Sequence, residues 1–140
     1  MSKKRMFSRM LAAVLTVVSI LQVGAVSSDA AGNYQDTKYV FAFEGEQTYT
    51  TFREKRDDTS SYMKCESCTS GASYTAHVVG LSGSSIYDVS NGHVYLFTTG
   101  TTYKMINYAY ENGFGWAGIA AVPNYAYEFS ASGLWSPDSV

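Results

Sequence analysis

The sequence predicts an all-β protein: an antiparallel β-sandwich or small barrel of about eight strands, preceded by a cleavable signal peptide. Three observations support this prediction. The 140 residues are 46% hydrophobic and 15% aromatic, with 12 Tyr and 12 Gly, a composition typical of sheets and turns. Short segments of alternating apolar residues are separated by turn sequences, and no segment has the 3.6-residue apolar spacing of an amphipathic helix. The N-terminal 30 residues have the layout of an export signal.

Residues 1–30 are expected to direct export and then to be removed. Four basic residues between positions 3 and 9 precede an uncharged run at 10–26, and small or polar residues follow. Ser28 and Ala30 provide the small side chains needed before the cut, which predicts cleavage after Ala30. A retained membrane anchor is the alternative, but the apolar run is at the short limit for crossing about 30 Å of hydrocarbon. We expect no stable membrane insertion after cleavage.

The first strand candidates lie in the N-terminal half of the mature domain, residues 31–140. They are residues 39–43, 49–53, 62–65 and 73–79, chosen for their period-two pattern. The segment 39–43 is apolar on both faces, as expected for a central strand or one under a second layer. The following segment, 80–92, is interpreted as a surface connection whose Ile86, Tyr87 and Val89 fold back onto the body, with a binding loop as the alternative.

Turn residues separate the last four candidates. These candidates are residues 93–98, 102–110, 114–122 and 125–131. Gly100, the Asn112-Gly113 pair and Pro123 mark the three turns between them. Consecutive strands joined by short turns indicate an antiparallel meander. In the last candidate, Tyr125 alternates with smaller or polar neighbours, which predicts one apolar face.

The charge of the mature domain excludes one class of partner. Once residues 1–30 are removed, six basic and eleven acidic residues remain, a net charge of −5. An acidic domain lacks the positive surface that binds nucleic acid or anionic lipids. The basic run at 53–56 is followed by Asp57 and Asp58 and is interpreted as a solvated loop.

The two cysteines, Cys65 and Cys68, form the most chemically distinctive motif. In an exported chain they predict a local disulfide that closes a turn, and a free dithiol or an intermolecular bridge is the alternative. A redox motif would require a helix N-terminus beside the first thiol, and no helix is expected. A zinc site would need His77 and His93 as further ligands, but their spacing does not match a zinc finger. We expect neither a metal nor another cofactor.

Catalysis is not expected, so no catalytic residue is assigned. Only two histidines are available for a Ser-His-Asp site, and no Gly-x-Ser-x-Gly sequence is present. The carboxylates that a glycoside hydrolase would need lie mostly beside turns. Binding is the favoured class, because tyrosine and tryptophan rings provide large contact surfaces at low conformational cost. Good strand propensity of tyrosine is the alternative explanation for its abundance.

Several segments of the mature chain carry a resemblance to a known family. They are residues 49–55, 61–66, 105–108 and 129–139. Together with the signal peptide they resemble small secreted Firmicutes proteins grouped as the uncharacterised family DUF2712, which provides no catalytic residues to transfer. Members of that family occur beside bacteriocin-associated membrane proteins and ABC transporters. Such genes also accompany lactococcin-972-like bacteriocins, which are small exported β-sandwich proteins.

These observations give one expected function and two alternatives. We expect a secreted, extracellular, non-enzymatic β-sandwich that acts by surface recognition of an extracellular protein or a cell-envelope glycan. The first alternative, implied by the resemblance and its gene context, is a bacteriocin-like secreted protein. A cell-wall hydrolase is the less favoured alternative.

Overall fold

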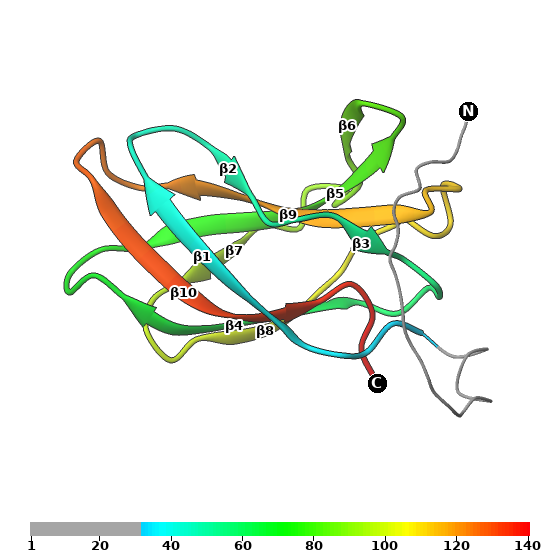
Figure 1. Ribbon diagram of the computed structural model, residues 1–140, viewed down its shortest axis with the longest axis horizontal. Helices are drawn as coiled ribbons and strands as arrows, with labels where there is room; N and C mark the ends of the chain where they lie inside the picture. The colour runs from blue at the N-terminus through cyan, green and yellow to red at the C-terminus, as the bar shows by residue number, and fades with distance from the viewer. Residues whose placement is uncertain (1–31) are drawn as a thin grey trace. The chain divides into compact units, whose positions relative to one another are not determined.

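The computed structural model describes residues 32–140, and this part of the chain is all-β (Figure 1). Its ten strands form two antiparallel sheets that pack face to face, which confirms the predicted sandwich. Among residues 32–140, no helix has the length and apolarity needed to cross a membrane. The expected signal peptide at 1–30 and its cleavage after Ala30 lie outside the described residues.

The smaller sheet has four strands in the order β1-β10-β4-β8. Their bounds are Thr37–Phe43 for β1, Phe129–Ser136 for β10, Ser61–Cys68 for β4 and Thr102–Met105 for β8. β1 and β4 both pair with the C-terminal strand β10, in registers that include Phe43 opposite Phe129 and Trp135 opposite Met63. The last strand of the chain is therefore central in this sheet.

The larger sheet has six strands built around β5 and β9, which run antiparallel over eight residue pairs. The bounds are Thr48–Tyr49 for β2, Arg53–Glu54 for β3, Tyr74–Ser82 for β5, Ser85–Asp88 for β6, Tyr95–Phe97 for β7 and Trp116–Pro123 for β9. β2 and β3 pair with β9, whereas β6 and β7 pair with β5. The β5–β6 hairpin projects from the body in Figure 1.

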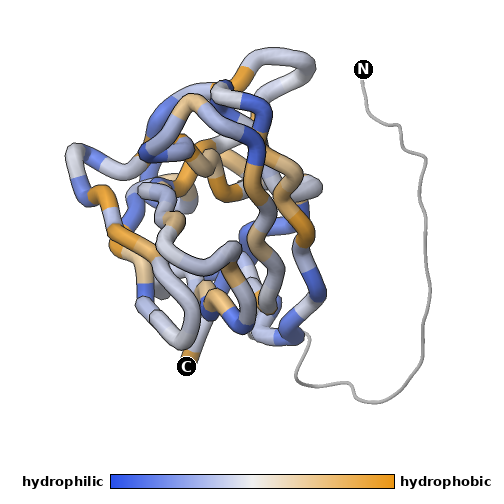
Figure 2. Tube along the Cα trace, turned by 90° about the vertical axis from the view of Figure 1, so that its left-hand side faces the viewer, coloured by the Kyte–Doolittle hydropathy of each residue, from blue (hydrophilic) through white to orange (hydrophobic). Residues whose placement is uncertain are grey.

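Aromatic rings fill the space between the sheets. Tyr74 of β5 stacks on Phe97 with ring centroids 5.3 Å apart, and it meets Phe41 of the other sheet edge-on at 5.6 Å. The hydroxyls of Tyr39 and Tyr74 are buried and form a hydrogen bond of 2.6 Å. Burial raises the pKa of both phenols. Buried and exposed residues alternate along β1, as a two-layer core requires. Figure 2 shows hydrophobic and hydrophilic segments interspersed along the trace.

The predicted antiparallel meander of the last four segments is wrong. β7 pairs with β5, β8 with β4 and β9 with β5, whereas β10 pairs with β1 and β4. Each of these connections passes from one sheet to the other. Turn residues mark where a chain reverses, but they do not determine which sheet the next strand joins.

Three strand assignments also require correction. The predicted strand 49–53 is interrupted, because only Thr48–Tyr49 and Arg53–Glu54 are strands, and each pairs separately with β9. In the other two segments, aromatic residues continue beyond the strands. The segment 102–110 is a strand only as far as Met105. The segment 125–131 becomes a strand only at Phe129, and Tyr125 and Tyr127 stack in the preceding loop with ring centroids 5.0 Å apart. High strand propensity made these loop residues look like strands.

The segment 39–43 is not central: it is an edge strand, β1, with one face packed under the second sheet. β7 also lies at a sheet edge, and Val40 of β1 is 74% exposed. The segment 80–92 is also more regular than expected, because β6 forms a hairpin with β5 and exposes Ile86 and Tyr87, while Val89 is buried. Its tight turn uses Gly83 with φ of 61°.

A β-bulge interrupts the pairing of β4 with β10. Ser132 lies opposite Ser67, but the next residue, Gly133, lies opposite Cys65, so Glu66 is the extra residue. The two backbones approach closely here, because a Cβ atom on Gly133 would lie 1.9 Å from the carbonyl oxygen of Lys64. Only glycine fits opposite the bulge.

We predict that Gly133→Ala lowers the free energy of unfolding by at least about 2 kcal/mol, because the methyl group forces two central strands apart. Urea denaturation measures this loss. Gly115→Ala is the matched control, since its added Cβ meets nothing within 4 Å, and its effect should stay within about 0.5 kcal/mol. Equal effects of the two substitutions would contradict the described bulge.

Candidate functional site

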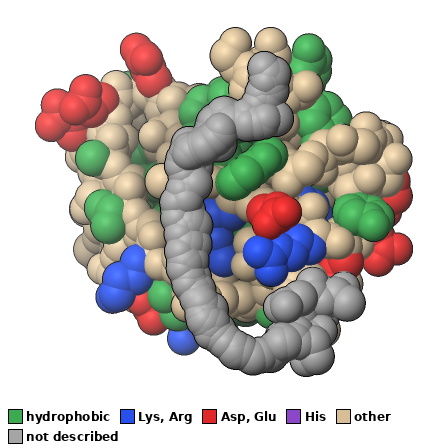
Figure 3. Space-filling view, turned by 45° about the vertical axis from the view of Figure 1, so that its right-hand side comes forward, with side chains coloured by type: hydrophobic (Ala, Val, Ile, Leu, Met, Phe, Trp, Pro, Cys, Tyr) green, Lys and Arg blue, Asp and Glu red, His purple; other side chains and the backbone are tan. Residues whose placement is uncertain are grey.

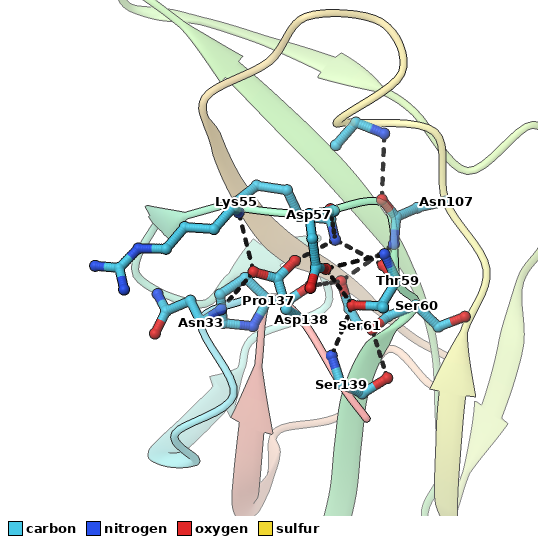
Figure 4. A network of polar contacts seen from close by, with 12 residues as sticks. Asn33, Lys55, Asp57, Thr59, Ser60, Ser61, Asn107, Pro137, Asp138 and Ser139 are labelled. Carbon is cyan, nitrogen blue, oxygen red and sulfur yellow. Dashed lines mark hydrogen bonds and ion pairs between the residues drawn. The ribbon is translucent and has the colours of Figure 1, made fainter. Parts of the chain in front are cut away.

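A buried polar network joins the C-terminus to the segment after β3 (Figure 4). The Lys55 ammonium donates to the Asp138 carboxylate and to the carbonyl oxygens of Asp57 and Thr59, at 2.8 and 2.6 Å. The second Asp138 oxygen accepts the backbone N–H groups of Asn33 and Arg56, at 2.7 and 2.9 Å. The side chains of Lys55 and Asp138 are only 1% and 0% exposed. We call this pair and its backbone partners the terminal clasp.

The interpretation of 53–56 as a solvated loop is therefore wrong. Lys55 is buried, and Arg53 is half-buried with its guanidinium 5.4 Å from the centre of the Trp135 ring. Arg53 also donates to the carbonyl oxygens of Trp135 and Gln35, at 3.1 and 2.7 Å, and burial lowers its pKa. Only Glu54 and Arg56 form an exposed pair. Although residues 53–56 are adjacent in the sequence, their charged side chains lie in different environments.

The terminal clasp is structural. Hydrogen bonds from Ser61 to the Pro137 carbonyl oxygen, at 2.8 Å, and from Asn107 to Ser61, at 3.2 Å, continue the network into the interior. Burial alone raises the pKa of the Asp57 carboxyl, but hydrogen bonds from Thr59 outweigh it and hold that pKa below its usual range. Because the ion pair is buried and its polar groups are paired, a substrate could reach it only if the fold opened.

The cysteines and histidines singled out in the sequence do not form one cluster. Cys65 and Cys68 both lie on β4, so the expectation that they flank a turn is wrong. Cys65 is buried and Cys68 half-buried, and both are free thiols in this structure, so the disulfide itself stays a prediction. Burial raises the pKa of each thiol. His77 lies 3.8 Å from Asp88, and His93 follows a turn. Within residues 32–140, no group of three His, Cys, Asp or Glu side chains is placed to hold a metal ion.

A surface cleft of about 290 Å³ lies beside the projecting β5–β6 hairpin. Its lining residues come from the end of β5, from β6 and from the loop before β9. They are Leu81, Ser82, Tyr87, Asn112, Gly113, Phe114 and Gly115. We call it the hairpin cleft. It combines two aromatic rings with hydroxyl, amide and backbone groups.

Gly80 determines how the aromatic wall forms. It lies directly opposite Tyr87 in the hairpin, so both face the same side of the sheet. A Cβ atom on Gly80 would lie 2.7 Å from the Phe114 ring, so the missing side chain leaves space for that ring. Phe114 packs against Tyr87 with ring centroids 5.6 Å apart. Phe114 therefore supports the Tyr87 ring on one side, even though Tyr87 is 52% exposed.

A tight backbone turn that includes Phe114 provides the other wall. The N–H of Gly113 donates to the Tyr110 carbonyl oxygen at 3.0 Å, and the N–H of Phe114 donates to that of Ala109 at 2.9 Å. Gly113 has φ of 85°, which glycine adopts without the strain other residues carry. Ala109 is itself buried, so the turn is anchored to the core.

The lining residues of the hairpin cleft carry no charge. Its rings favour a ligand with an apolar face, and its polar groups can exchange hydrogen bonds with hydroxyl or amide groups. Sequence reasoning missed this site because it lies in two segments assigned to a plain loop and a strand. The Asn112-Gly113 turn was predicted correctly. Gly80 was the remaining clue, because a glycine in a strand often marks the close approach of another segment.

The comparisons with known proteins give one match. The model of a family described as "Protein of unknown function (DUF2712)" matches residues 26–139. No curated protein and no solved structure matches the chain.

We predict that Lys55→Met lowers the free energy of unfolding by about 3–5 kcal/mol, because it leaves the buried Asp138 carboxylate without its counter-charge. Adding Asp138→Asn should recover part of the loss. Arg56→Ala, which removes the exposed pair with Glu54, should cost no more than about 1 kcal/mol. Urea denaturation of the variants checks this order, and a Lys55→Met loss as small as that of Arg56→Ala would refute the clasp.

Proposed function

The chain belongs to the DUF2712 family of proteins of unknown function, and from that premise we propose an exported, non-enzymatic protein that recognises a glycan. The ligand is a neutral saccharide of the cell envelope, bound in the hairpin cleft. The single observation that carries this proposal is the uncharged cleft with the Tyr87 ring supported on Phe114.

The chemistry of a sugar ring fits the two walls of the cleft. A pyranose has an apolar face of C–H groups, which packs against an aromatic ring, and a rim of hydroxyl groups that need hydrogen-bond partners. Tyr87 and Phe114 provide the aromatic wall, whereas Ser82, Asn112 and the backbone near Gly113 provide donors and acceptors. The cleft volume is near the lower end of the usual range for ligand sites, about 300–1,000 Å³, which suits a short saccharide segment.

The distribution of tyrosine supports a binding role over a purely structural one. Eight of the 12 tyrosines are exposed, so the core accounts for few of them. Figure 3 shows hydrophobic side chains, tyrosine included, reaching the surface among interspersed charges. Rings held at the surface by the fold lose little conformational freedom on binding.

Export is the part of the proposal that rests on the sequence. The basic start, the apolar run and the small residues before position 31 support it. The acidic balance of the mature chain favours a neutral ligand over an anionic polymer.

We predict that Tyr87→Ala weakens the binding of a neutral N-acetylglucosamine oligosaccharide about 30-fold, which corresponds to about 2 kcal/mol for a central aromatic contact. Calorimetry with the oligosaccharide and co-sedimentation with its insoluble neutral polymer, chitin, measure the affinity. Tyr125→Ala is the matched control, because this exposed tyrosine lies in the β9–β10 loop, outside the cleft lining.

Three outcomes would refute parts of this proposal. Equal losses for Tyr87→Ala and Tyr125→Ala would show that the cleft is not the site. Retention of an oligouronate but of no neutral saccharide would refute the ligand class. Saccharide cleavage by the wild-type protein would refute the non-enzymatic role.

A further inference from the structure

The bulge in β4 changes which way its two cysteines face. In a regular strand, residues three positions apart point to opposite faces. Here Cys68 lies opposite Ala131 and Cys65 lies opposite Gly133, with Glu66 as the extra residue between them. Directly opposite residues share a face, and Ala131 and Gly133 are two positions apart on β10. Both cysteines therefore face the interior of the sandwich, where Cys65 belongs to the core and Cys68 packs against it.

The same register brings the two cysteines close together. Two residues along a strand span about 6.6 Å, whereas three span about 10 Å. Since Cys65 and Cys68 lie opposite residues two positions apart, their Cα atoms are separated by about the smaller distance. Disulfides usually join residues whose Cα atoms are roughly 4.4–6.8 Å apart. The bulge thus brings the pair to the upper end of this range, whereas a regular strand would place it beyond the range, and the two thiols lie close enough to interact with each other.

We propose that the bulge makes Cys65 and Cys68 a dedicated disulfide site within one strand, formed by thiol–disulfide exchange with an oxidised thiol partner outside the cell. Gly133 is part of the site, because its missing side chain lets the strands close around the bulge. The site is independent of the hairpin cleft, since neither cysteine lines it.

Exposure sets the order of the exchange. Cys68 is partly exposed and Cys65 is buried, so the Cys68 thiolate attacks the disulfide of the oxidant. The oxidant's S–S bond breaks, a mixed disulfide forms on Cys68 and one thiolate leaves. The Cys65 thiolate then attacks the Cys68 sulfur, which forms the internal bridge and releases the second thiolate. The two cysteine thiols lose two electrons and two protons, and the oxidant is reduced to two thiols.

The bridge would stabilise a part of the fold where several segments meet. Thr99 of the β7–β8 loop accepts the Cys68 N–H and donates to the Cys68 carbonyl oxygen, at 2.9 and 3.1 Å. The Cys65 carbonyl oxygen accepts the Gly100 N–H at 2.7 Å. Cys65 also lies beside the Tyr39 and Tyr74 hydroxyls of the core. A covalent link here would therefore hold the bulged end of β4 in the conformation that these neighbouring segments contact.

The test uses protein produced from the full-length sequence and incubated with oxidised glutathione, then denatured and alkylated. We expect the wild-type chain to lose about 2 Da, the mass of two hydrogen atoms, and to leave neither thiol open to alkylation. Reduction should restore both thiols and lower Tm by a few degrees. Cys65→Ser should instead accumulate a mixed disulfide with glutathione on Cys68, and Cys68→Ser should react much more slowly.

A transposed variant tests the geometry. Ser67→Cys combined with Cys68→Ser keeps two cysteines but moves one to Ser67, opposite Ser132 on the outer face. This variant should form mixed disulfides or dimers and little internal bridge. Two open thiols in the oxidised wild-type chain, or an internal bridge formed equally well by the transposed variant, would overturn the proposal. The wild-type result decides the matter even if the transposed variant fails to fold.

Discussion

The fold depends on the register that places Tyr74 between the two sheets. The Tyr74 ring contacts Phe41 and Phe97, and its hydroxyl is satisfied by Tyr39, so a large polar-tipped side chain is buried without an unpaired group. Side chains alternate along a strand, so the register that buries Tyr74 also turns Gly80, six residues later, to the same face. The space that Phe114 occupies beside Tyr87 therefore results from the same strand register that builds the core.

Two local features, the terminal clasp and the β-bulge, fix how segments distant in the sequence pack together. The terminal clasp joins Lys55 to Asp138 across 83 positions of sequence and fastens the segment after β3 to the end of the chain. The bulge at Glu66 and its partner Gly133 let the C-terminal strand pack between β1 and β4. A buried ion pair contributes little net stability against apolar side chains of similar shape, but losing one partner is costly. The clasp therefore determines how Asp138 and the segment after β3 are arranged more than it increases the free energy of unfolding.

The sequence was sufficient for the fold class because strand periodicity and turn chemistry are local signals. Gly100 and Gly113 both adopt the positive φ their turns required. Strand order was not predictable, because pairing depends on contacts between distant residues, and the meander expected from short turns did not form. Lys55 and Asp138 gave no pattern that distinguished them from solvated charges. The hairpin cleft was hidden for a related reason: Gly80 and Phe114 are 34 positions apart, and only the fold brings them together.

The most direct test of the central claim is an NMR titration of the protein with a neutral N-acetylglucosamine tetramer. The cleft defined by Gly80, Tyr87 and Phe114 predicts that backbone amide shifts concentrate at residues 81–87 and 112–115. Saturating changes confined to the β9–β10 loop around Tyr125, or no saturable change at any amide, would contradict the account.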